Sequence, residues 1–262
     1  MTCGFAFVAD PWTDYDAIYD SAYYAGRGAD PLVDYAFEWS QPERTVRFYE
    51  WRGISRVVAE LVQLGSDTRW LDFGCGTGGL VRYLRDTTGC TAVGYERGWA
   101  ADRLSVPHLD DDGLQDAAGT FDVVTAVEVI EHAIEPMELL LQFRRLLRPG
   151  GLLLLTTGNA ESYRDHLARW RYVVPEIHVS FFEPGTLALA LEKARFRPQR
   201  PGLLPGHVDI LRFKILKNLG IRRRSYFEAV LPWPLLARAV NIKVRATAHP
   251  IGFADDTPEN AS

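Results

Sequence analysis

Cysteine is scarce in this chain, and so are long apolar runs and excess basic charge. The 262 residues include three cysteines, Cys3, Cys75 and Cys90, and these lack the spacing of metal ligands. An odd and sparse set of cysteines argues against a disulfide scaffold and favours a reducing compartment. We therefore expect a cytoplasmic protein.

Other absences narrow the class of protein further. The longest aliphatic run, 152–155, is far shorter than the roughly 20 residues of a membrane span. The N-terminus has neither the basic start nor the apolar run of a signal peptide, so we expect no secretion signal. A net charge of −5 provides no basic footprint for nucleic acid. The sequence shows no internal repeat.

What is present is enough for one large domain, or a domain with a cap. Apolar residues make up 47% of the chain and aromatic residues 12%, which supports a sizeable core. The apolar spacing alternates between that of strands and that of helices. Strands are predicted at 70–73, 91–96, 104–109, 121–127 and 152–157, and helices at 42–65, 80–85, 136–147 and 184–195. Such alternation predicts an α/β fold, with a doubly wound parallel sheet that binds ligands at the strand carboxyl ends.

The remaining segments are less regular. Weaker patterns predict helices at 208–219 and 226–240, the second interrupted by Pro232 and Pro234, and a last strand at 247–253. We expect residues 1–66 to form an N-terminal helical cap and 67–200 the core. Residues 201–254 would complete the same domain with a helical substrate lid, and 255–262 would be a flexible tail. Arg222-Arg223-Arg224 is either a grip for phosphate or carboxylate, or a solvated basic turn.

A glycine-rich turn stands after the first core strand. Gly74, Gly76 and Gly79 match G-x-G-x-x-G, and Glu96 follows about 20 residues later, as in a dinucleotide-binding fingerprint. Glycine lets the backbone bend sharply and lie against a ligand. By itself this pattern also allows a nicotinamide-dependent oxidoreductase. The surroundings differ, because Asp72 precedes an alternating series of glycines that includes Gly78.

With these surroundings the sequence resembles the class I S-adenosylmethionine-dependent methyltransferases, in their ubiquinone-biosynthesis-type small-molecule branch. The resemblance covers about residues 67–196. The motifs that carry it are Leu-Asp-Phe-Gly-Cys-Gly-Thr-Gly at 71–78, Val-Gly-Tyr-Glu at 93–96, Phe-Asp-Val-Val at 121–124, Glu-Val-Ile-Glu-His at 128–132, Leu-Leu-Arg-Pro-Gly-Gly at 146–151 and His-Val-Ser-Phe-Phe at 178–182. It implies a Rossmann-like, seven-stranded, mostly parallel sheet with a helical cap and a C-terminal helical insertion.

The resemblance also implies a cofactor site for S-adenosylmethionine. Glu96 would accept hydrogen bonds from both ribose hydroxyls, a role that suits a carboxylate. Asp72 would hold either the loop or the cofactor's ammonium group. The acid that would bind adenine falls near Asp110, and the adjacent backbone N–H near Asp111. Because Asp110, Asp111 and Asp112 are successive acids, the sequence leaves open which of them takes this role. The full set of cofactor-binding residues is Asp72, Gly74, Cys75, Gly76, Gly78, Glu96, Arg97, Asp110, Asp111, Val127 and Glu128.

Four tyrosines of the cap have two interpretations. Tyr15, Tyr19, Tyr23 and Tyr24 either pack the cap or place one or two rings against the cofactor, since a sulfonium or an adenine ring favours aromatic neighbours.

Methyl transfer to a hydroxyl needs positioning and usually a base. His132 and His178 are the candidate catalytic bases, because an unperturbed histidine titrates near neutrality. Each could instead be a hydrogen-bonded framework residue. Glu128, Glu131, His132 and His178 could also bind Mg²⁺ or Mn²⁺, since the spacing resembles that of small-RNA 2′-O-methyltransferases with a divalent ion.

The sequence leaves the acceptor open. We expect a small or medium acceptor, first a hydroxyl of a sugar, a natural product or a lipid-linked glycan. Rival hypotheses are the nicotinamide oxidoreductase, an RNA methyltransferase, which the acidic balance disfavours, and a non-catalytic S-adenosylmethionine-binding protein. Nothing in the sequence decides between a monomer and a homodimer.

Overall fold

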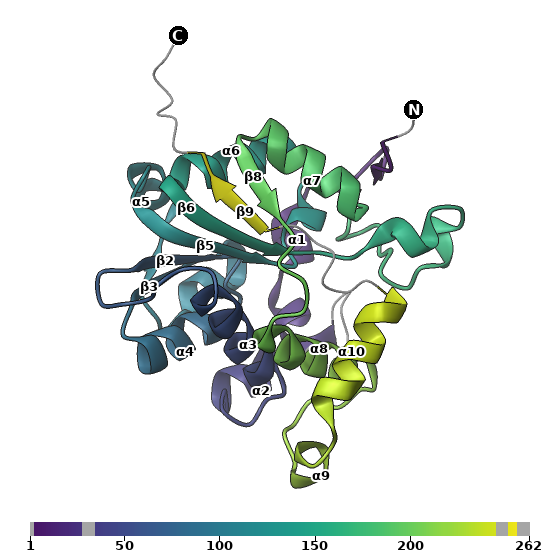
Figure 1. The fold of residues 1–262 in the computed structure, drawn as a ribbon. Helices are drawn as coiled ribbons and strands as arrows, with labels where there is room; N and C mark the ends of the chain where they lie inside the picture. Colours follow the sequence, from purple (N-terminus) through teal and green to yellow (C-terminus); the bar gives the residue numbers. More distant parts are fainter. Residues whose placement is uncertain (1–2, 28–34, 245–250, 256–262) are drawn as a thin grey trace.

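A seven-stranded sheet forms the centre of the molecule (Figure 1). The structure is a computed structural model, and it describes residues 3–27, 35–244 and 251–255. The strand order is β4-β3-β2-β5-β6-β9-β8. The strands are β2 Arg69–Phe73, β3 Thr91–Tyr95, β4 His108–Leu109, β5 Phe121–Val127, β6 Leu147–Thr156, β8 Phe196–Gln199 and β9 Ile251–Ala254. Only β9 runs antiparallel to its neighbours, so the predicted Rossmann-like, mostly parallel sheet is confirmed.

Helices cover both faces of this sheet (Figure 1). They are α1 Tyr15–Ile18, α2 Tyr35–Ser40, α3 Arg47–Ala59, α4 Gly79–Thr88, α5 Asp111–Asp116, α6 Pro136–Leu146, α7 Pro184–Lys193, α8 Pro205–Asn218, α9 Tyr226–Ala229 and α10 Trp233–Val244. The leucines of β6 alternate between the faces, as strand geometry requires. Leu153 and Leu155 pack in the core with α6 and α7, whereas Leu152 and Leu154 pack in the core with α3 and α4.

The N-terminal helices are tied to the C-terminal insertion by a close crossing of α3 and α8. A Cβ added at Gly53 of α3 would lie 2.7 Å from the Gly206 carbonyl oxygen, and one at Gly206 would lie 2.4 Å from that of Gly53. Glycine at both positions therefore lets the two backbones touch. Helices α8, α9 and α10 lie between β8 and β9 in the chain, which confirms the predicted helical insertion.

The N-terminus is not wholly helical. Strand β1, Ala6–Phe7, pairs antiparallel with β7, Ser180–Phe181, in a separate two-stranded sheet. The proposed domain boundaries at 66 and 200 stay predictions, and residues 256–262 of the proposed tail lie outside the described residues. Within the described residues, none of the helices is both long and apolar enough to cross a bilayer.

Several predicted elements differ from the structure in extent. Only His108–Leu109 of the predicted strand at 104–109 pairs with β3. The predicted helix at 226–240 is split into α9 and α10 at Leu231 and Pro232, because proline cannot continue a helix. Strand β8 was not predicted. Its Pro198 disfavours a central strand, but β8 lies at the edge of the sheet, where proline is tolerated.

Candidate active site

The glycine turn joins β2 to α4 at the carboxyl edge of the sheet. Gly74, Gly76 and Gly78 have φ angles of 72°, 55° and 74°, in the left-handed region that favours glycine. A Cβ at Gly76 would meet only the Tyr35 ring, at 3.7 Å, so the turn presents its backbone to open space. The cradle therefore fits a ligand that lies directly on the main chain.

Glu96 follows β3, the strand next to β2, and this brings its carboxylate to the turn. Its Oε2 accepts a hydrogen bond from the Gly76 N–H at 2.6 Å, and its Oε1 accepts one from the Arg97 N–H at 3.0 Å. Burial raises the pKa of Glu96, and the two backbone N–H groups oppose that rise. A carboxylate with two oxygens still has lone pairs for a diol.

Asp72 is buried at the base of the same turn. Its Oδ1 accepts a hydrogen bond from the Thr125 hydroxyl at 2.9 Å, and burial raises its pKa to about 7. The Cys75 sulfur packs against β3, since a Cβ at Gly94 would lie 2.6 Å from it, and Cys75 also lines the main cavity. The Cys75 N–H donates to the Tyr95 carbonyl at 3.1 Å.

The three successive acids are exposed. Asp110 caps α5, because its Oδ1 accepts from the Gly113 N–H at 2.8 Å. Asp111 accepts from the Tyr95 hydroxyl at 2.5 Å and lies 3.5 Å from the Arg97 guanidinium. Arg97 lines the main cavity, whereas Asp110, Asp111 and Asp112 are not among the described residues that line it.

Val127 and Glu128 stand at the end of β5, where both line the main cavity. Glu128 has a φ of 55°, a left-handed conformation that is strained for a residue other than glycine. Its carboxylate lies 2.8 Å from the Lys214 ammonium and accepts from the Tyr172 hydroxyl at 3.0 Å. Burial would raise the pKa of Glu128, but the Lys214 charge holds it well below its usual range.

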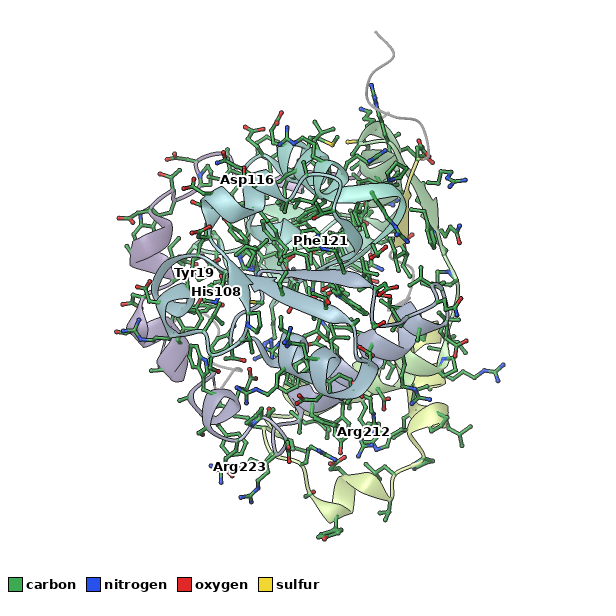
Figure 2. The ribbon with its side chains drawn as sticks, turned by 90° about the vertical axis from the view of Figure 1, so that its left-hand side faces the viewer. Tyr19, His108, Asp116, Phe121, Arg212 and Arg223 are labelled. Atoms are coloured by element: carbon green, nitrogen blue, oxygen red, sulfur yellow. The ribbon has the colours of Figure 1, made fainter. Side chains whose placement is uncertain are left out.

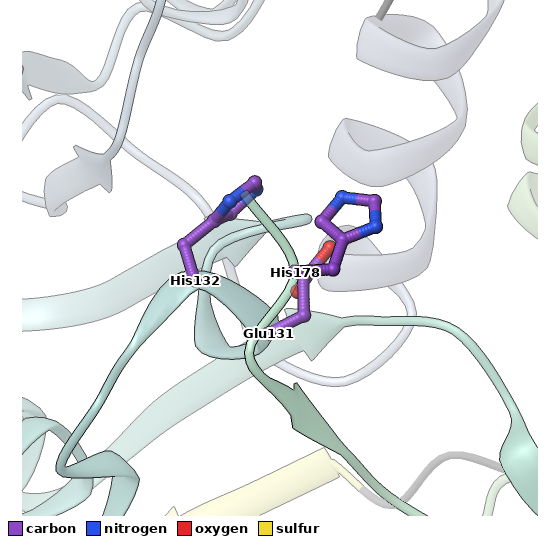
Figure 3. A group of neighbouring side chains, drawn as sticks. All are labelled: Glu131, His132 and His178. Atoms are coloured by element: carbon purple, nitrogen blue, oxygen red, sulfur yellow. The ribbon is translucent and has the colours of Figure 1, made fainter. Parts of the chain in front are cut away.

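Three further side chains of the predicted metal set converge in the structure (Figure 3). Glu131, His132 and His178 can each bring one ligand atom to within 4.8 Å of the others. Glu128, the fourth residue of the predicted metal set, belongs instead to the ion pair with Lys214. The structure therefore brings together three of the four predicted residues.

The two imidazoles are held in the same tautomer. His132 Nδ1 lies 2.8 Å from the Ile177 carbonyl oxygen, and His178 Nδ1 lies 2.5 Å from that of Tyr172. A carbonyl oxygen only accepts, so each Nδ1 carries the hydrogen and each Nε2 keeps a lone pair. The ring centroids are 4.9 Å apart, and both residues line the main cavity. Each imidazole is thus presented as a base or as a ligand.

Glu131 is fully buried, and its two oxygens differ. Oε1 is hydrogen-bonded to the Tyr172 hydroxyl, whereas Oε2 has no hydrogen-bond partner among the described residues. Burial, followed by the charge of Glu128, raises the pKa of Glu131 to about 8. One hydroxyl hydrogen cannot serve both Glu128 and Glu131, so a proton or a cation is needed at Glu131 near neutral pH.

Because Glu131 keeps a proton in the folded state, we expect the stability of Glu131→Gln relative to the wild type to increase as pH rises. The folded pKa of about 8 lies above the ordinary value of ~4.3, so the folded state keeps a proton that the unfolded state releases. Wild-type stability should therefore fall as pH rises from about 4 to 8, by at most about 1.4 kcal/mol per pH unit from this group. Because glutamine does not titrate, the melting temperature of the variant should fall less steeply with pH.

Thermal unfolding in chelator across this pH range measures the effect. Glu192→Gln, at an exposed position on α7, is the matched control and should follow the wild type. Parallel melting curves for wild type and Glu131→Gln would contradict a proton held at Glu131.

Aromatic residues of the N-terminal segment contribute to the cavity wall. Tyr19, Tyr23, Tyr24 and Tyr35 all line the main cavity, and Tyr23 and Tyr24 are also buried. Figure 2 shows Tyr19 on the N-terminal segment, and its hydroxyl lies 2.8 Å from His132 Nδ1. The tyrosines can therefore both pack the cap and contact a cofactor, since their rings pack together and face the cavity. The side chain of Tyr15 lies outside the described residues.

Tyr172 and Lys214 were missed by the sequence interpretation. Tyr172 joins Glu128, Glu131 and, through its carbonyl, His178, and its ring stacks on His178 with centroids 4.3 Å apart. Lys214 is 86 residues from Glu128 in the chain. No local pattern links such distant partners, so only the tertiary structure could find them.

One cavity of about 1640 Å³ contains the glycine turn, Glu96, both histidines and Lys214. This exceeds the roughly 300–1,000 Å³ typical of a single-ligand pocket. A cofactor and an acceptor can therefore occupy it together. A Rossmann-like sheet with a glycine turn, a carboxylate beside that turn and a cavity of this size is typical of enzymes that bind a nucleoside cofactor together with a second ligand.

Comparison with known proteins gives the family. A model of the Methyltransferase domain family matches residues 44–199, which is more than half of the chain. The chain therefore belongs to this family, and the predicted membership of the class I S-adenosylmethionine-dependent methyltransferases is confirmed. S-adenosylmethionine is the cofactor of this class, and the cradle described above fits it.

Individual relatives are similar over part of their length. A ubiquinone biosynthesis O-methyltransferase of a Caulobacter species is 31% identical over 142 residues, which cover 45% of this chain and 55% of that protein. A malonyl-[acyl-carrier protein] O-methyltransferase of Enterobacter lignolyticus is 31% identical over 124 residues, covering 44% and 48%. The chain thus spans about half the length of the curated relatives that it matches.

A solved structure supports the fold. A Haemonchus contortus phosphoethanolamine N-methyltransferase 2, bound to phosphomonomethylethanolamine and S-adenosylhomocysteine, has a TM-score of 0.50 and 16% identity, covering 94% of this chain and 62% of that one.

Proposed function

We propose that this protein transfers a methyl group from S-adenosylmethionine to a hydroxyl oxygen of a small or medium acceptor. The observation that carries this proposal is the pair of imidazoles, His132 and His178, whose ring centroids lie 4.9 Å apart and which line the same cavity as the glycine turn. One Nε2 takes the acceptor's proton as the oxygen attacks the methyl carbon. The carbon–sulfur bond breaks, and its electron pair returns to sulfur.

The acceptor class is argued from the cavity and the relatives. Both curated relatives described above are named O-methyltransferases, which supports oxygen as the accepting atom. A hydroxyl of a sugar, a natural product or a lipid-linked glycan fits a large cavity with aromatic walls and the Lys214–Glu128 ion pair. The cofactor-binding set, the cap and lid boundaries, and a cytoplasmic location belong to the same proposal.

A screen for methyl transfer tests the function. Radiolabelled S-adenosylmethionine is incubated with the protein and panels of phenols, sugars, amines and carboxylic acids. Label transferred to a hydroxyl supports the proposal, and label transferred to nitrogen or carbon alone contradicts its finer part. Cofactor binding by calorimetry without transfer to any panel would favour the non-catalytic alternative, and tight NAD binding alone would favour the oxidoreductase.

A metal-assisted reaction is the second candidate, favoured by one observation. The unpartnered Oε2 belongs to buried Glu131, whose carboxylate lies within 4.8 Å of ligand nitrogens of both imidazoles, a donor set that suits Mn²⁺ or Mg²⁺. The ion would replace the proton at Glu131 and lower the pKa of the acceptor hydroxyl.

Removal of metal separates the two candidates. If the histidines act as bases alone, methyl transfer should be unchanged in chelator. If an ion is required, chelator should abolish transfer and Mn²⁺ or Mg²⁺ should restore it. Calorimetry with Mn²⁺ gives a second readout, because binding by wild type and none by His178→Asn would identify the site without any acceptor.

A further inference from the structure

Several large apolar side chains of the α9–α10 arm are exposed to solvent. Its apolar tip consists of Tyr226, Val230, Leu231 and Leu235, with exposed fractions of 94%, 82%, 45% and 70%. These residues surround the turn between α9 and α10, which Figure 1 places at the extremity of the molecule. Exposed apolar residues that gather in one place mark an interaction site, whereas scattered ones are ordinary.

The arm is held in place from behind, so the tip is a built feature. Glu228 and Trp233 are each only 5% exposed, and the Trp233 Nε1–H donates to the Glu228 carbonyl at 2.6 Å. Glu228 also accepts from the Tyr49 hydroxyl at 2.7 Å and from Arg212 Nε at 2.9 Å. Two inward anchors thus fix the arm to α3 and α8. Its outward side is apolar where a surface helix is normally polar.

The α9–α10 arm, taken together with the segment that precedes it, carries a net charge opposite in sign to that of the whole chain. Residues 219–244 include five basic residues, Arg222, Arg223, Arg224, Arg238 and Lys243, and one acid, Glu228. That acid is buried in the ion pair with Arg212, so it does not offset the exposed arginines. The complete chain has a net charge of −5. Arg222, Arg223 and Arg224 lie just before α9, and Arg238 follows Leu235 by three residues, so four exposed arginines lie close to the apolar tip in the chain.

From the apolar tip and its arginines, we infer that this arm docks on the surface of an anionic lipid bilayer. Apolar side chains at a projecting turn can enter the boundary between headgroups and acyl chains, while neighbouring arginines contact lipid phosphates. Figure 2 shows labelled Arg223 at the same end of the molecule as the arm, and its guanidinium lies 4.6 Å from the Phe37 ring centroid. The arm also reaches the site at its other end, since Val240 of α10 lines the main cavity.

Sedimentation with vesicles tests this inference on the full chain. The wild type should sediment with vesicles of phosphatidylcholine and phosphatidylglycerol at low salt, and much less with phosphatidylcholine alone. The double variant Leu231→Ser/Leu235→Gln should bind at least about tenfold more weakly, because it removes the apolar insertion. Arg238→Glu should bind about tenfold more weakly, and high salt should weaken wild-type binding.

Matched controls change the same residue types elsewhere. Leu189→Gln, at a leucine that is 43% exposed on α7, and Arg145→Glu, at an exposed position on α6, should bind vesicles like the wild type. All variants should bind S-adenosylmethionine with unchanged affinity, which shows that they are folded. Failure of the docking inference is therefore distinguishable from failure of the proposed reaction.

Three results would overturn the inference. One is absence of binding to anionic vesicles at low salt, and another is an equal loss in the tip and control variants. The third is a dimer in analytical ultracentrifugation that Leu231→Ser/Leu235→Gln abolishes without changing sedimentation with vesicles. That last result would assign the tip to a second copy of this chain.

Discussion

His132→Asn should lower kcat by roughly 10²–10⁴-fold while the affinity for S-adenosylmethionine stays unchanged. Asparagine keeps a side-chain N–H near the position of Nδ1, so the hydrogen bond to the Ile177 carbonyl can persist. It lacks an atom at Nε2, so the base is removed while the framework is kept. His178→Asn applies the same change beside the Tyr172 carbonyl. Single-turnover kinetics and calorimetry measure the two quantities separately.

The pH profile and a double variant sharpen this prediction. Burial, and then the charge of His178, lowers the pKa of His132 to about 4. If His132 is the base, it stays neutral down to that pH, and the acid limb of kcat/KM should lie near 4 rather than near ~6.5. If the two histidines act as one unit, the double variant should lose little more than the more damaging single variant.

His166→Asn is the matched control, because His166 is exposed and does not line the main cavity. Unchanged kcat in both active-site variants would show that positioning of the reactants alone supplies the rate, and that the histidines are framework residues.

Glu96→Gln should raise the Kd for S-adenosylmethionine by roughly 100-fold. Glutamine keeps one oxygen to accept from the Gly76 N–H but turns the second acceptor into an N–H₂ donor. One ribose hydroxyl then meets a donor that is held in place, and the hydrogen bond to a charged acceptor is lost. Isothermal titration with S-adenosylhomocysteine gives the Kd without any acceptor.

The exposed Glu192→Gln serves again as control and should bind with the wild-type Kd. A Kd that changes less than about threefold in Glu96→Gln would exclude the ribose role for this carboxylate, because a hydrogen bond to a charged group contributes about 1.5–3 kcal/mol.

Local patterns predicted much of the core, and their failures have physical causes. The continuous apolar run of β5 was predicted with its observed bounds, because a strand buried on both faces leaves few alternatives. The edge strand β8 was missed, since its pairing depends on β9, more than 50 residues later in the chain. The two-residue β4 was predicted too long for the same reason, because a partner decides where pairing ends.

The candidate site divides in the same way. Gly74, Gly76, Gly78 and Glu96 could be found from spacing, because a tight turn and the next strand end are local features. The position of the adenine-binding acid could not. Asp110 caps a helix, whereas Asp111 accepts a hydrogen bond from Tyr95. Three identical neighbouring residues give no sequence signal that shows which of them takes which partner.

The sequence by itself determined the α/β class, the glycine turn and the cofactor, because each depends on residues close together in the chain. Only the tertiary structure decided the charge state of Glu131, the pairing of Glu128 with Lys214 and the tautomer of both histidines. Those properties come from burial and from partners between 6 and 86 residues away. It also decided that α9 and α10 meet at an exposed apolar tip, since a sequence pattern does not show which side of a helix other elements cover.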